Sequence, residues 1–296
     1  MSDVAVLKLG GSVLSGEDPY RRAATFLRAE VTRTKTRIVA VVSAEYGHTD
    51  LLWNEARSVS DVVDEDARDL LWSTGELRSV ALLTLALRAT GLTATGLNVH
   101  QTGLRVADRL AGSGGLVLNP LALQAALGRN SIVVVPGFLA TCRQEIVTLG
   151  RGGSDWSAVA LAAALHASRC ELIKDVAGYF TADPRTAPEA ELIAALDYTA
   201  ALEMADAGCP LVQRQAIDHA RRAHLPLIVR SFDSPGTRVA ESSSAAKATP
   251  YVPFLRGETD GIRDTYDSRG TALGAKHRSR GGTHFSDHDV SADCAG

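Results

Sequence analysis

Short apolar segments alternate with longer amphipathic segments from Val4 to Arg230. The apolar segments have the length and β-branched content of buried strands, whereas the longer segments repeat apolar residues at helical spacing. Strands that alternate with helices form a mainly parallel sheet, because each strand returns to the sheet through a helix that covers one of its faces. The sequence therefore predicts an α/β fold, a three-layer αβα sandwich around a mainly parallel sheet.

The same pattern predicts where the individual elements lie. We expect strands at Val4–Leu9, Arg37–Ala44, Leu92–Val99, Ser131–Pro136, Glu171–Ile173 and Leu225–Arg230, and a hairpin at Phe138–Leu149. We expect helices at Tyr20–Lys35, Ala67–Thr90, Ser154–Ala167, Thr199–Ala207 and Leu211–Ala223, and one more after Asn119-Pro120. Ligands of such folds bind beyond the carboxyl ends of the strands, so the loops at those ends are the candidate site.

The alternating pattern ends near Phe232. The remaining sequence, Asp233–Gly296, is rich in Ser, Gly, Ala, Asp and Arg and has no apolar periodicity. We therefore divide the chain into a folded domain at residues 1–235 and a disordered tail at residues 236–296. Histidines in this tail are expected to be solvated rather than to hold a metal, because a metal site needs a fixed set of ligands: His277, His284 and His288.

Composition excludes several classes of function. A formal net charge of −3 gives no general attraction to nucleic acid or to an anionic membrane. We expect no apolar run long enough to span a membrane and no secretory leader after Met1. The four cysteines have no Cys-x-x-Cys spacing, which predicts a reduced, cytoplasmic compartment.

The stretch Thr148–Asp155 (Thr-Leu-Gly-Arg-Gly-Gly-Ser-Asp) stands directly before an Ala/Leu-rich helix. Unpaired N–H groups and a partial positive charge make a helix start a natural seat for anions. Two adjacent glycines let the backbone approach a ligand, Arg151 offers a planar fork for a carboxylate or phosphate, and Asp155 can hold a metal ion or another cation. An ordinary N-cap formed by Ser154 or Asp155 is the alternative. The run of such residues favours an anion site.

Four further loops with glycine or acidic residues fall at strand ends or helix breaks: Lys8–Ser12, Ser43–Thr49, Ser73–Glu76 and Lys174–Arg185. In the first, a lysine closes a buried strand and two glycines follow, which suits the neutralisation of phosphate. A solvated lysine at a strand end is equally consistent with this pattern. The third loop lies inside the long predicted helix, and we expect Gly75 to make that helix irregular. Taken singly, the last three loops are more typical of plain turns than of sites.

Taken together, these segments resemble the amino-acid kinase family, and within it the aspartate kinases. The resemblance covers residues 1–235 and is carried by Lys8-x-Gly10-Gly11, by Thr148–Asp155 and by Asp175-x-x-Gly178-x-x-Thr181-Ala-Asp-Pro-Arg185. It implies the amino-acid kinase, or carbamate kinase-like, fold and ATP-dependent phosphorylation of the β-carboxylate of L-aspartate to 4-phospho-L-aspartate, a step of amino-acid biosynthesis. It also implies a cytoplasmic homodimer, ATP and an acidic amino acid as ligands, and Mg²⁺ that is carried by ATP without direct protein ligands.

The resemblance implies roles for the matching positions. Lys8 would contact the transferring phosphoryl group, and Asp155 would orient that lysine. Glu76 would pair with the ammonium of the substrate and Arg151 with its α-carboxylate. The implied substrate-binding residues are Ser43, Thr49, Glu76 and Arg151, and the implied ATP-binding residues are Lys8, Gly10, Gly11, Ser12, Lys174, Asp175, Phe180 and Arg185.

The segment Gly208–Gln215 departs from the aspartate kinase pattern. Pro210 stands at the position of a nucleotide-contacting lysine, and Gln213-Arg214 replace a His-Pro pair. Lys174 stands where many aspartate kinases carry threonine, and we expect it to supply the missing positive charge to the ATP phosphates. A solvated lysine is the alternative. The regulatory ACT modules of the family are not expected in Asp233–Gly296, which lacks a βαββαβ pattern.

Two other functions stay open at this point. One is a related kinase that acts on another small carboxylate or phosphate, and the other is a non-catalytic protein that binds a nucleotide or oxyanion. A carboxylate that attacks the γ-phosphoryl group of ATP is already a nucleophile, so such an enzyme needs no general base and must instead hold two anions together. Lys8 and Asp155 favour the enzyme, because binding alone does not need a lysine that an acid holds at the transferring group.

Overall fold

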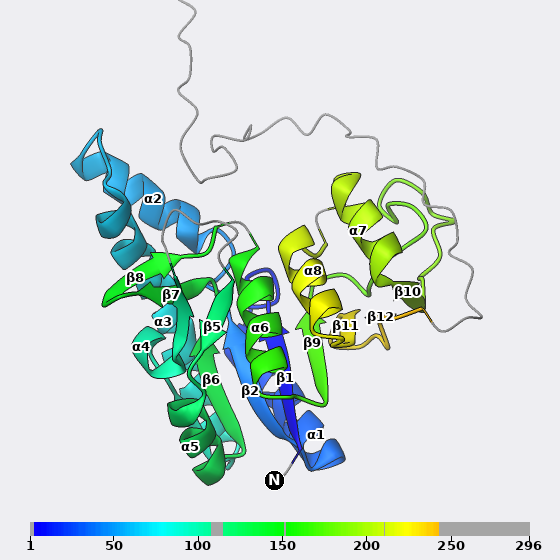
Figure 1. Cartoon of the computed structure of the whole chain (residues 1–296), viewed down its shortest axis with the longest axis horizontal. Coiled ribbons are helices and arrows are strands. Elements are labelled where there is room, and N and C mark those ends of the chain that lie inside the picture. The colour runs from blue at the N-terminus through cyan, green and yellow to red at the C-terminus, as the bar shows by residue number, and fades with distance from the viewer. Residues whose placement is uncertain (1–2, 108–114, 151, 210, 243–296) are drawn as a thin grey trace, which may run out of the picture. The chain divides into compact units, whose positions relative to one another are not determined.

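The protein is described by a computed structural model that covers residues 3–107, 115–150, 152–209 and 211–242. These residues lie in one compact unit, Met1–Glu258, whereas the second unit, Thr259–Gly296, lies outside the described residues. The unit contains an eight-stranded sheet, whose strands run β10-β12-β11-β9-β1-β2-β6-β3 across the sheet, and a four-stranded sheet in the order β5-β4-β7-β8 (Figure 1).

Neighbouring strands of the large sheet are parallel except for the pair β11–β12. The bounds of the strands are β1 (Val4–Leu9), β2 (Arg37–Val42), β3 (Ala94–Gly96), β6 (Ile132–Pro136), β9 (Arg169–Ile173), β10 (Ala195–Asp197), β11 (Leu227–Arg230) and β12 (Thr237–Ala240). The small sheet consists of β4 (Leu104–Val106), β5 (Leu116–Leu118), β7 (Leu139–Cys142) and β8 (Glu145–Thr148).

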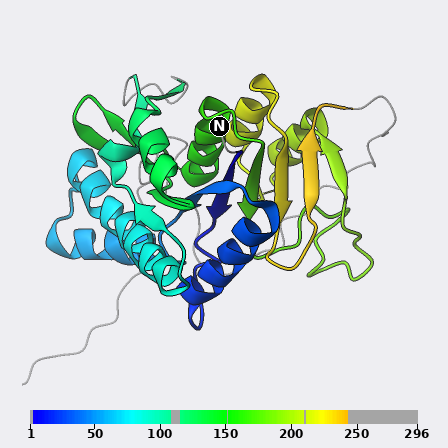
Figure 2. The ribbon, with the colours of Figure 1, turned by 90° about the horizontal axis from the view of Figure 1, so that it is seen from below.

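Helices cover both faces of the large sheet (Figure 2). One face carries α1 (Pro19–Thr34) and α3 (Glu65–Ala89), which share a core with alternate residues of the central strands. The other face carries α5 (Leu121–Arg129), α6 (Gly153–Ala164), α7 (Tyr198–Asp206) and α8 (Arg214–Arg222). Two more helices, α2 (His48–Val59) and α4 (Val99–Thr102), follow β2 and β3. The predicted three-layer α/β fold is confirmed.

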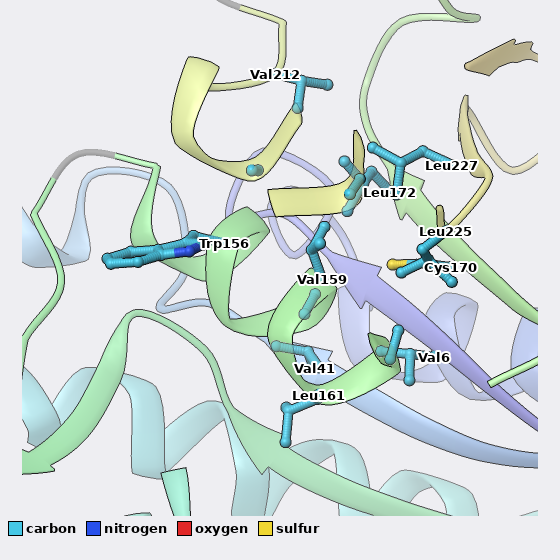
Figure 3. Packing of buried hydrophobic residues seen from close by; sticks show 14 of the residues in the cluster. Val6, Val41, Trp156, Val159, Leu161, Cys170, Leu172, Val212, Leu225 and Leu227 are labelled. Carbon is cyan, nitrogen blue, oxygen red and sulfur yellow. The ribbon is translucent and has the colours of Figure 1, made fainter. Parts of the chain in front are cut away.

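Side chains of the central strands alternate between the two cores, as the period of two in a strand requires. In β1, Leu7 faces the α1–α3 layer, and Val6 faces α6. Figure 3 shows Val6 and Leu172 beside Val159 of α6. The same alternation places Lys8 and Lys174 on the α6 side of the sheet, where their strands end.

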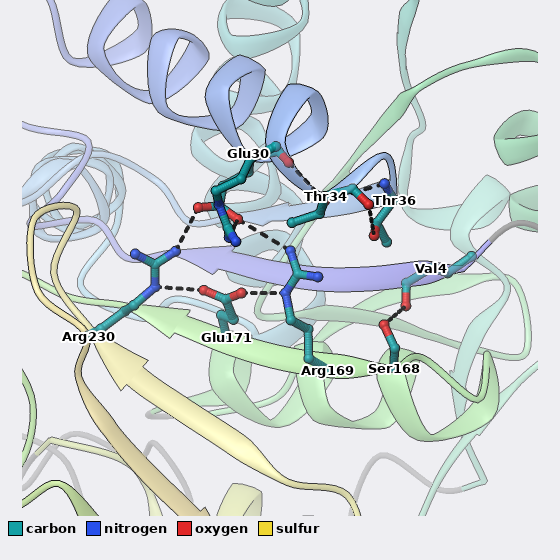
Figure 4. A network of polar contacts seen from close by, with 9 residues as sticks. Val4, Glu30, Thr34, Thr36, Ser168, Arg169, Glu171 and Arg230 are labelled. Atoms are coloured by element: carbon teal, nitrogen blue, oxygen red, sulfur yellow. Dashed lines mark hydrogen bonds and ion pairs between the residues drawn. The ribbon is translucent and has the colours of Figure 1, made fainter.

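On the α1 side, Glu30, Arg169, Glu171 and Arg230 form a closed ring of ion pairs (Figure 4). The carboxylate of Glu171 lies 2.5 Å from Nε of Arg169 and 2.7 Å from Nε of Arg230. Glu30 of α1 accepts from both guanidinium groups at 3.3 and 3.2 Å. Because each carboxylate bridges both arginines, the ring joins α1 to β9 and β11.

Several predicted elements differ from the structure. The interruption of the long helix at Gly75 was a wrong expectation, because α3 is continuous there. A Cβ at this position would lie 2.9 Å from His48 and 3.2 Å from Ala44, so the glycine serves a close approach between segments. The strand expected at Leu92–Val99 is shorter, since α4 begins at Val99. Helix α2 and strands β4, β5 and β10 were not predicted.

Two expectations about boundaries also change. Strand β12 falls in the segment predicted as tail and pairs with β10 and β11, so the folded region extends to at least Ala240. The remainder of the predicted tail, residues 243–296 with its histidines, lies outside the described residues. Contrary to the composition argument, α3 is long and apolar enough to cross a membrane by length and composition alone. It contacts α1, α2 and the sheet, and it buries the charged residues Asp69 and Glu76.

Candidate functional site

The candidate site lies where β1, β2 and β9 end. These strands are adjacent and parallel, so the loops that follow them meet at one edge of the sheet. Gly10 donates its N–H to the carbonyl of Ile173 at 3.2 Å, which joins the ends of β1 and β9. Ser12 donates its hydroxyl to Oδ1 of Asp175 at 3.0 Å. The predicted loops at Lys8–Ser12 and Lys174–Asp175 are therefore in direct contact.

Asp155 is the centre of the charged part of the site. It lies in the first turn of α6 and is almost fully buried. Its Oδ1 lies 2.8 Å from Nζ of Lys8, and its Oδ2 lies 2.7 Å from Nζ of Lys174. Burial alone would raise the pKa of this carboxyl group, but the charges and hydrogen bonds of the two lysines outweigh burial and hold the pKa to about 2.

Lys174 is not the solvated lysine of the alternative interpretation, since only 14% of its side chain is exposed. Burial lowers the pKa of this lysine, the charge of Asp155 opposes that effect, and the charge of Lys8 adds to it. Its backbone N–H donates to the carbonyl of Arg230 at 2.8 Å, which fixes the start of the loop. The site therefore contains two ammonium groups that share one buried carboxylate.

The loop that precedes α6 has a backbone that favours glycine. Gly152 has a φ of 72°, in the left-handed region, and forms the N-terminal boundary of α6. A Cβ at this position would overlap the side chain of Gln213, so α8 begins directly against the loop. The N-cap interpretation of Ser154 or Asp155 is wrong, because neither side chain caps the helix. Instead, the hydroxyl of Ser154 accepts a hydrogen bond of 3.0 Å from Ser43.

Arg151 and Pro210 lie outside the described residues. The pairing of Arg151 with a substrate carboxylate and the effect of Pro210 on nucleotide binding therefore stay predictions.

Glu76 presents a different kind of carboxylate. It lies in the middle of α3 and is almost fully buried, and its Oε2 atom has no hydrogen-bond partner among the described residues. Burial raises the pKa of this group to about 8, although a backbone hydrogen bond at Ala44 and the charge of Lys8 oppose the shift. A buried carboxylate in this state is suited to receive a cationic group.

The other predicted site residues differ in whether their contacts join them to Lys8 and Asp155. Gly11 accepts a hydrogen bond from the backbone N–H of Tyr46 at 3.2 Å, which brings the loop after β2 against the glycine loop. Thr49 lies half-buried in the first turn of α2.

Phe180 pairs with Leu192 in an isolated bridge. Arg185 forms an ion pair of 3.0 Å with Asp183, and 83% of its side chain is exposed. The described contacts of Phe180 and Arg185 do not include Lys8 or Asp155.

Sequence reasoning missed two features of the site. It did not foresee the bond between Ser43 and Ser154, which depends on the packing of α6 against β2. It also gave no role to Trp72, whose indole nitrogen is buried. The position of Trp72 four residues before Glu76 was the available signal, because residues at this spacing share one helix face.

The sequence profile of the amino acid kinase family matches residues 3–231 of this chain. The chain therefore belongs to the amino acid kinase family.

Among its relatives, the aspartokinase of Thermus thermophilus is 39% identical over 242 residues, which are 80% of this chain and 59% of that protein. The aspartate kinase of Synechocystis has a similar structure, with a TM-score of 0.71 and 36% identity over 85% of this chain and 41% of that one. E. coli aspartokinase III, in a complex with aspartate and ADP, gives a TM-score of 0.70 and 25% identity over 82% of this chain and 66% of that one. The chain spans about three fifths of the length of the curated aspartokinases that it matches.

Proposed function

We propose that this protein is an ATP-dependent kinase that phosphorylates the β-carboxylate of L-aspartate. The observation that carries the proposal is the buried Asp155 carboxylate, which holds the ammonium groups of Lys8 and Lys174 at the ends of β1 and β9. Phosphoryl transfer between two anions needs positive charge at the transferring group, and here that charge is fixed before any ligand arrives.

The reaction requires no proton transfer. A carboxylate oxygen of the acceptor attacks the γ-phosphorus of ATP, the bond from that phosphorus to the β,γ-bridging oxygen breaks, and ADP leaves with the electron pair. The product is 4-phospho-L-aspartate. Lys8 neutralises charge on the transferring group, and Asp155 keeps this lysine in place. Both oxygens of Asp155 face ammonium groups, so the carboxylate suits lysine orientation better than metal ligation. Mg²⁺ bound to ATP would supply further charge neutralisation.

The two ligands are assigned to different loops. Glu76 receives the ammonium of the acceptor, Arg151 its α-carboxylate, and Ser43 and Thr49 contact its other oxygens. The nucleotide contacts Lys8, Gly10, Gly11, Ser12, Lys174, Asp175, Phe180 and Arg185. The similarity to E. coli aspartokinase III, whose structure contains aspartate and ADP, supports this division. We further propose a cytoplasmic homodimer.

An ATP-dependent hydroxamate assay over a panel of acidic amino acids and simple carboxylates tests the proposal. We expect hydroxamate formation with L-aspartate and much less with L-glutamate, succinate or acetate. A preference for another small carboxylate would favour the related-kinase alternative. Nucleotide binding without turnover of any member of the panel would favour a non-catalytic protein.

A further inference from the structure

Two buried side-chain atoms have neither a hydrogen bond nor an ion pair in the part of the chain that the structure describes: Oε2 of Glu76 and Nε1 of Trp72. Unpartnered buried polar atoms are rare in folded proteins because each loses its hydrogen bonds to water. Glu76 belongs to the candidate site, and Trp72 lies on the same helix, α3.

Trp72 lies on the same side of α3 as Glu76, one helical turn earlier. Its ring packs against Phe138, with the ring centres 6.0 Å apart, and against Trp53 at 6.1 Å. Phe138 in turn lies against Gly153, because a Cβ at that glycine would be 3.2 Å from the phenyl ring. The side chain of Trp72 therefore packs between the body of α3 and the loop that leads into α6.

A second contact fixes this part of α3 against the same loop. Asp69 accepts hydrogen bonds from the backbone N–H and the hydroxyl of Thr148, at 3.1 and 2.8 Å. This stretch of α3 therefore extends from Asp69, which contacts Thr148 at the end of β8, to Glu76, whose carboxyl group is influenced by the charge of Lys8. Trp72 stands between these two points, and an indole N–H can only donate a hydrogen bond.

An amino acid has the complementary pair of groups: an ammonium that donates and carboxylates that accept. We propose that the indole N–H of Trp72 donates a hydrogen bond to a carboxylate oxygen of the acceptor amino acid whose ammonium pairs with Glu76. Trp72 is then a substrate-binding residue that contributes to the choice of acceptor. This inference rests on the proposed function. The competing interpretation is that Trp72 only fills the aromatic cluster.

The indole N–H signals of ¹⁵N-labelled protein give a direct test, because the chain contains only three tryptophans. The variant Trp72→Phe identifies the signal of Trp72. We expect that signal to shift when L-aspartate is added without nucleotide, because its N–H gains an acceptor. The signal of Trp156, which already donates to Nδ1 of His219 at 3.1 Å, should move much less. An unmoved Trp72 signal at saturating L-aspartate overturns the inference.

Steady-state kinetics separate the inference from the proposed function. Trp72→Phe keeps an aromatic ring and removes the N–H, so KM for aspartate should rise on the order of tenfold with little change in KM for ATP. Any loss of thermal stability should come from the smaller ring and be similar to that of Trp53→Phe, since the deleted N–H has no hydrogen-bond partner among the described residues. Trp53→Phe, in the same aromatic cluster, is the matched control and should leave both constants within about twofold.

If the wild-type protein phosphorylates L-aspartate and the Trp72→Phe variant has an unchanged KM for aspartate, the role of Trp72 is overturned and the proposed function is not. A wild-type protein that phosphorylates no carboxylic acid would overturn the proposed function, and the role of Trp72 with it. Equal increases of KM for aspartate in Trp72→Phe and Trp53→Phe would assign the effect to ring packing and would also overturn the inference.

Discussion

Lys174 and Asp155 come together from different elements, with Nζ of the lysine 2.7 Å from Oδ2 of the aspartate. The lysine follows β9, and the aspartate lies in the first turn of α6. Because Lys8 occupies the other oxygen of the same carboxylate, the two ammonium groups are held close to each other. Their mutual repulsion is balanced by a single buried negative charge, and a phosphate group would relieve the remaining positive charge.

The first prediction concerns Lys174. Lys174→Thr should raise KM for ATP on the order of tenfold or more and should raise KM for the acceptor much less, because one of the two charges available to phosphate is lost. Lys174→Arg keeps the charge and should recover part of the ATP affinity. Steady-state kinetics with each substrate varied in turn provide the measurement. An unchanged dependence on ATP in Lys174→Thr would limit this lysine to a structural role beside Asp155.

The second prediction concerns Lys8. Lys8→Ala should lower kcat by a factor on the order of 10² or more, because the side chain neutralises charge that develops on the transferring group. The fold should persist, since Lys174 still pairs with Asp155. Circular dichroism and thermal unfolding check the fold, and single-turnover kinetics check the chemical step. Near-normal turnover in this variant would remove Lys8 from the catalytic machinery.

Much of the fold was accessible from sequence because its central strands carry strong local signals. The apolar runs of β1, β2 and β6 are buried on both sides, so they are nearly continuous in the sequence. Helix α2 was missed because it buries only Leu52, while Leu51 and Val59 are exposed, so its apolar residues do not mark a buried face. Strand β3 was predicted too long because apolar residues continue past it into α4. Asn98 and Gln101 form a capping box that marks the start of that helix.

The site was predictable as a set of loops but not as a set of contacts. Lys8, Glu76 and Asp155 were identified from motifs, and the structure places each of them in the buried interior. The pairing of Lys174 with Asp155 depends on β9 lying beside β1 beneath α6, which no local pattern specifies. The lack of a hydrogen-bond partner for Oε2 of Glu76 and Nε1 of Trp72 within the described residues likewise results from tertiary packing around α3.

The third prediction concerns the ring on the α1 side of the sheet. Glu171→Gln should lower the free energy of unfolding by about 3–5 kcal/mol, because it removes the charge that two partly buried arginines share. Urea unfolding at neutral pH is the measurement. Arg33→Ala is the matched control, since 66% of the Arg33 side chain is exposed and its bond to Glu30 should contribute no more than about 1 kcal/mol. Equal losses in the two variants would contradict the structural role of the ring.

The fourth prediction concerns the effect of pH on acceptor binding through Glu76. Burial raises the pKa of this carboxyl group to about 8, so much of it is protonated at neutral pH. Only the ionised form attracts an ammonium group, and KM for aspartate should therefore fall as pH rises toward and past 8. Glu76→Gln should raise KM for aspartate by at least about tenfold and abolish this pH dependence. The ATP dependence should change much less.

The same group should make stability depend on pH. The pKa in the folded state lies above the ordinary value of 4.5, so the folded protein retains a proton that the unfolded chain releases between these two values. This contribution to stability is complete below pH 4.5 and is lost as pH rises through 8. Each unit of pKa shift corresponds to about 1.4 kcal/mol. Glu76→Gln stays neutral at every pH, so its stability relative to wild type should increase across this interval. A constant difference from pH 5 to 9 in urea unfolding would show that Glu76 titrates normally, and the pH dependence of acceptor binding would then need another group.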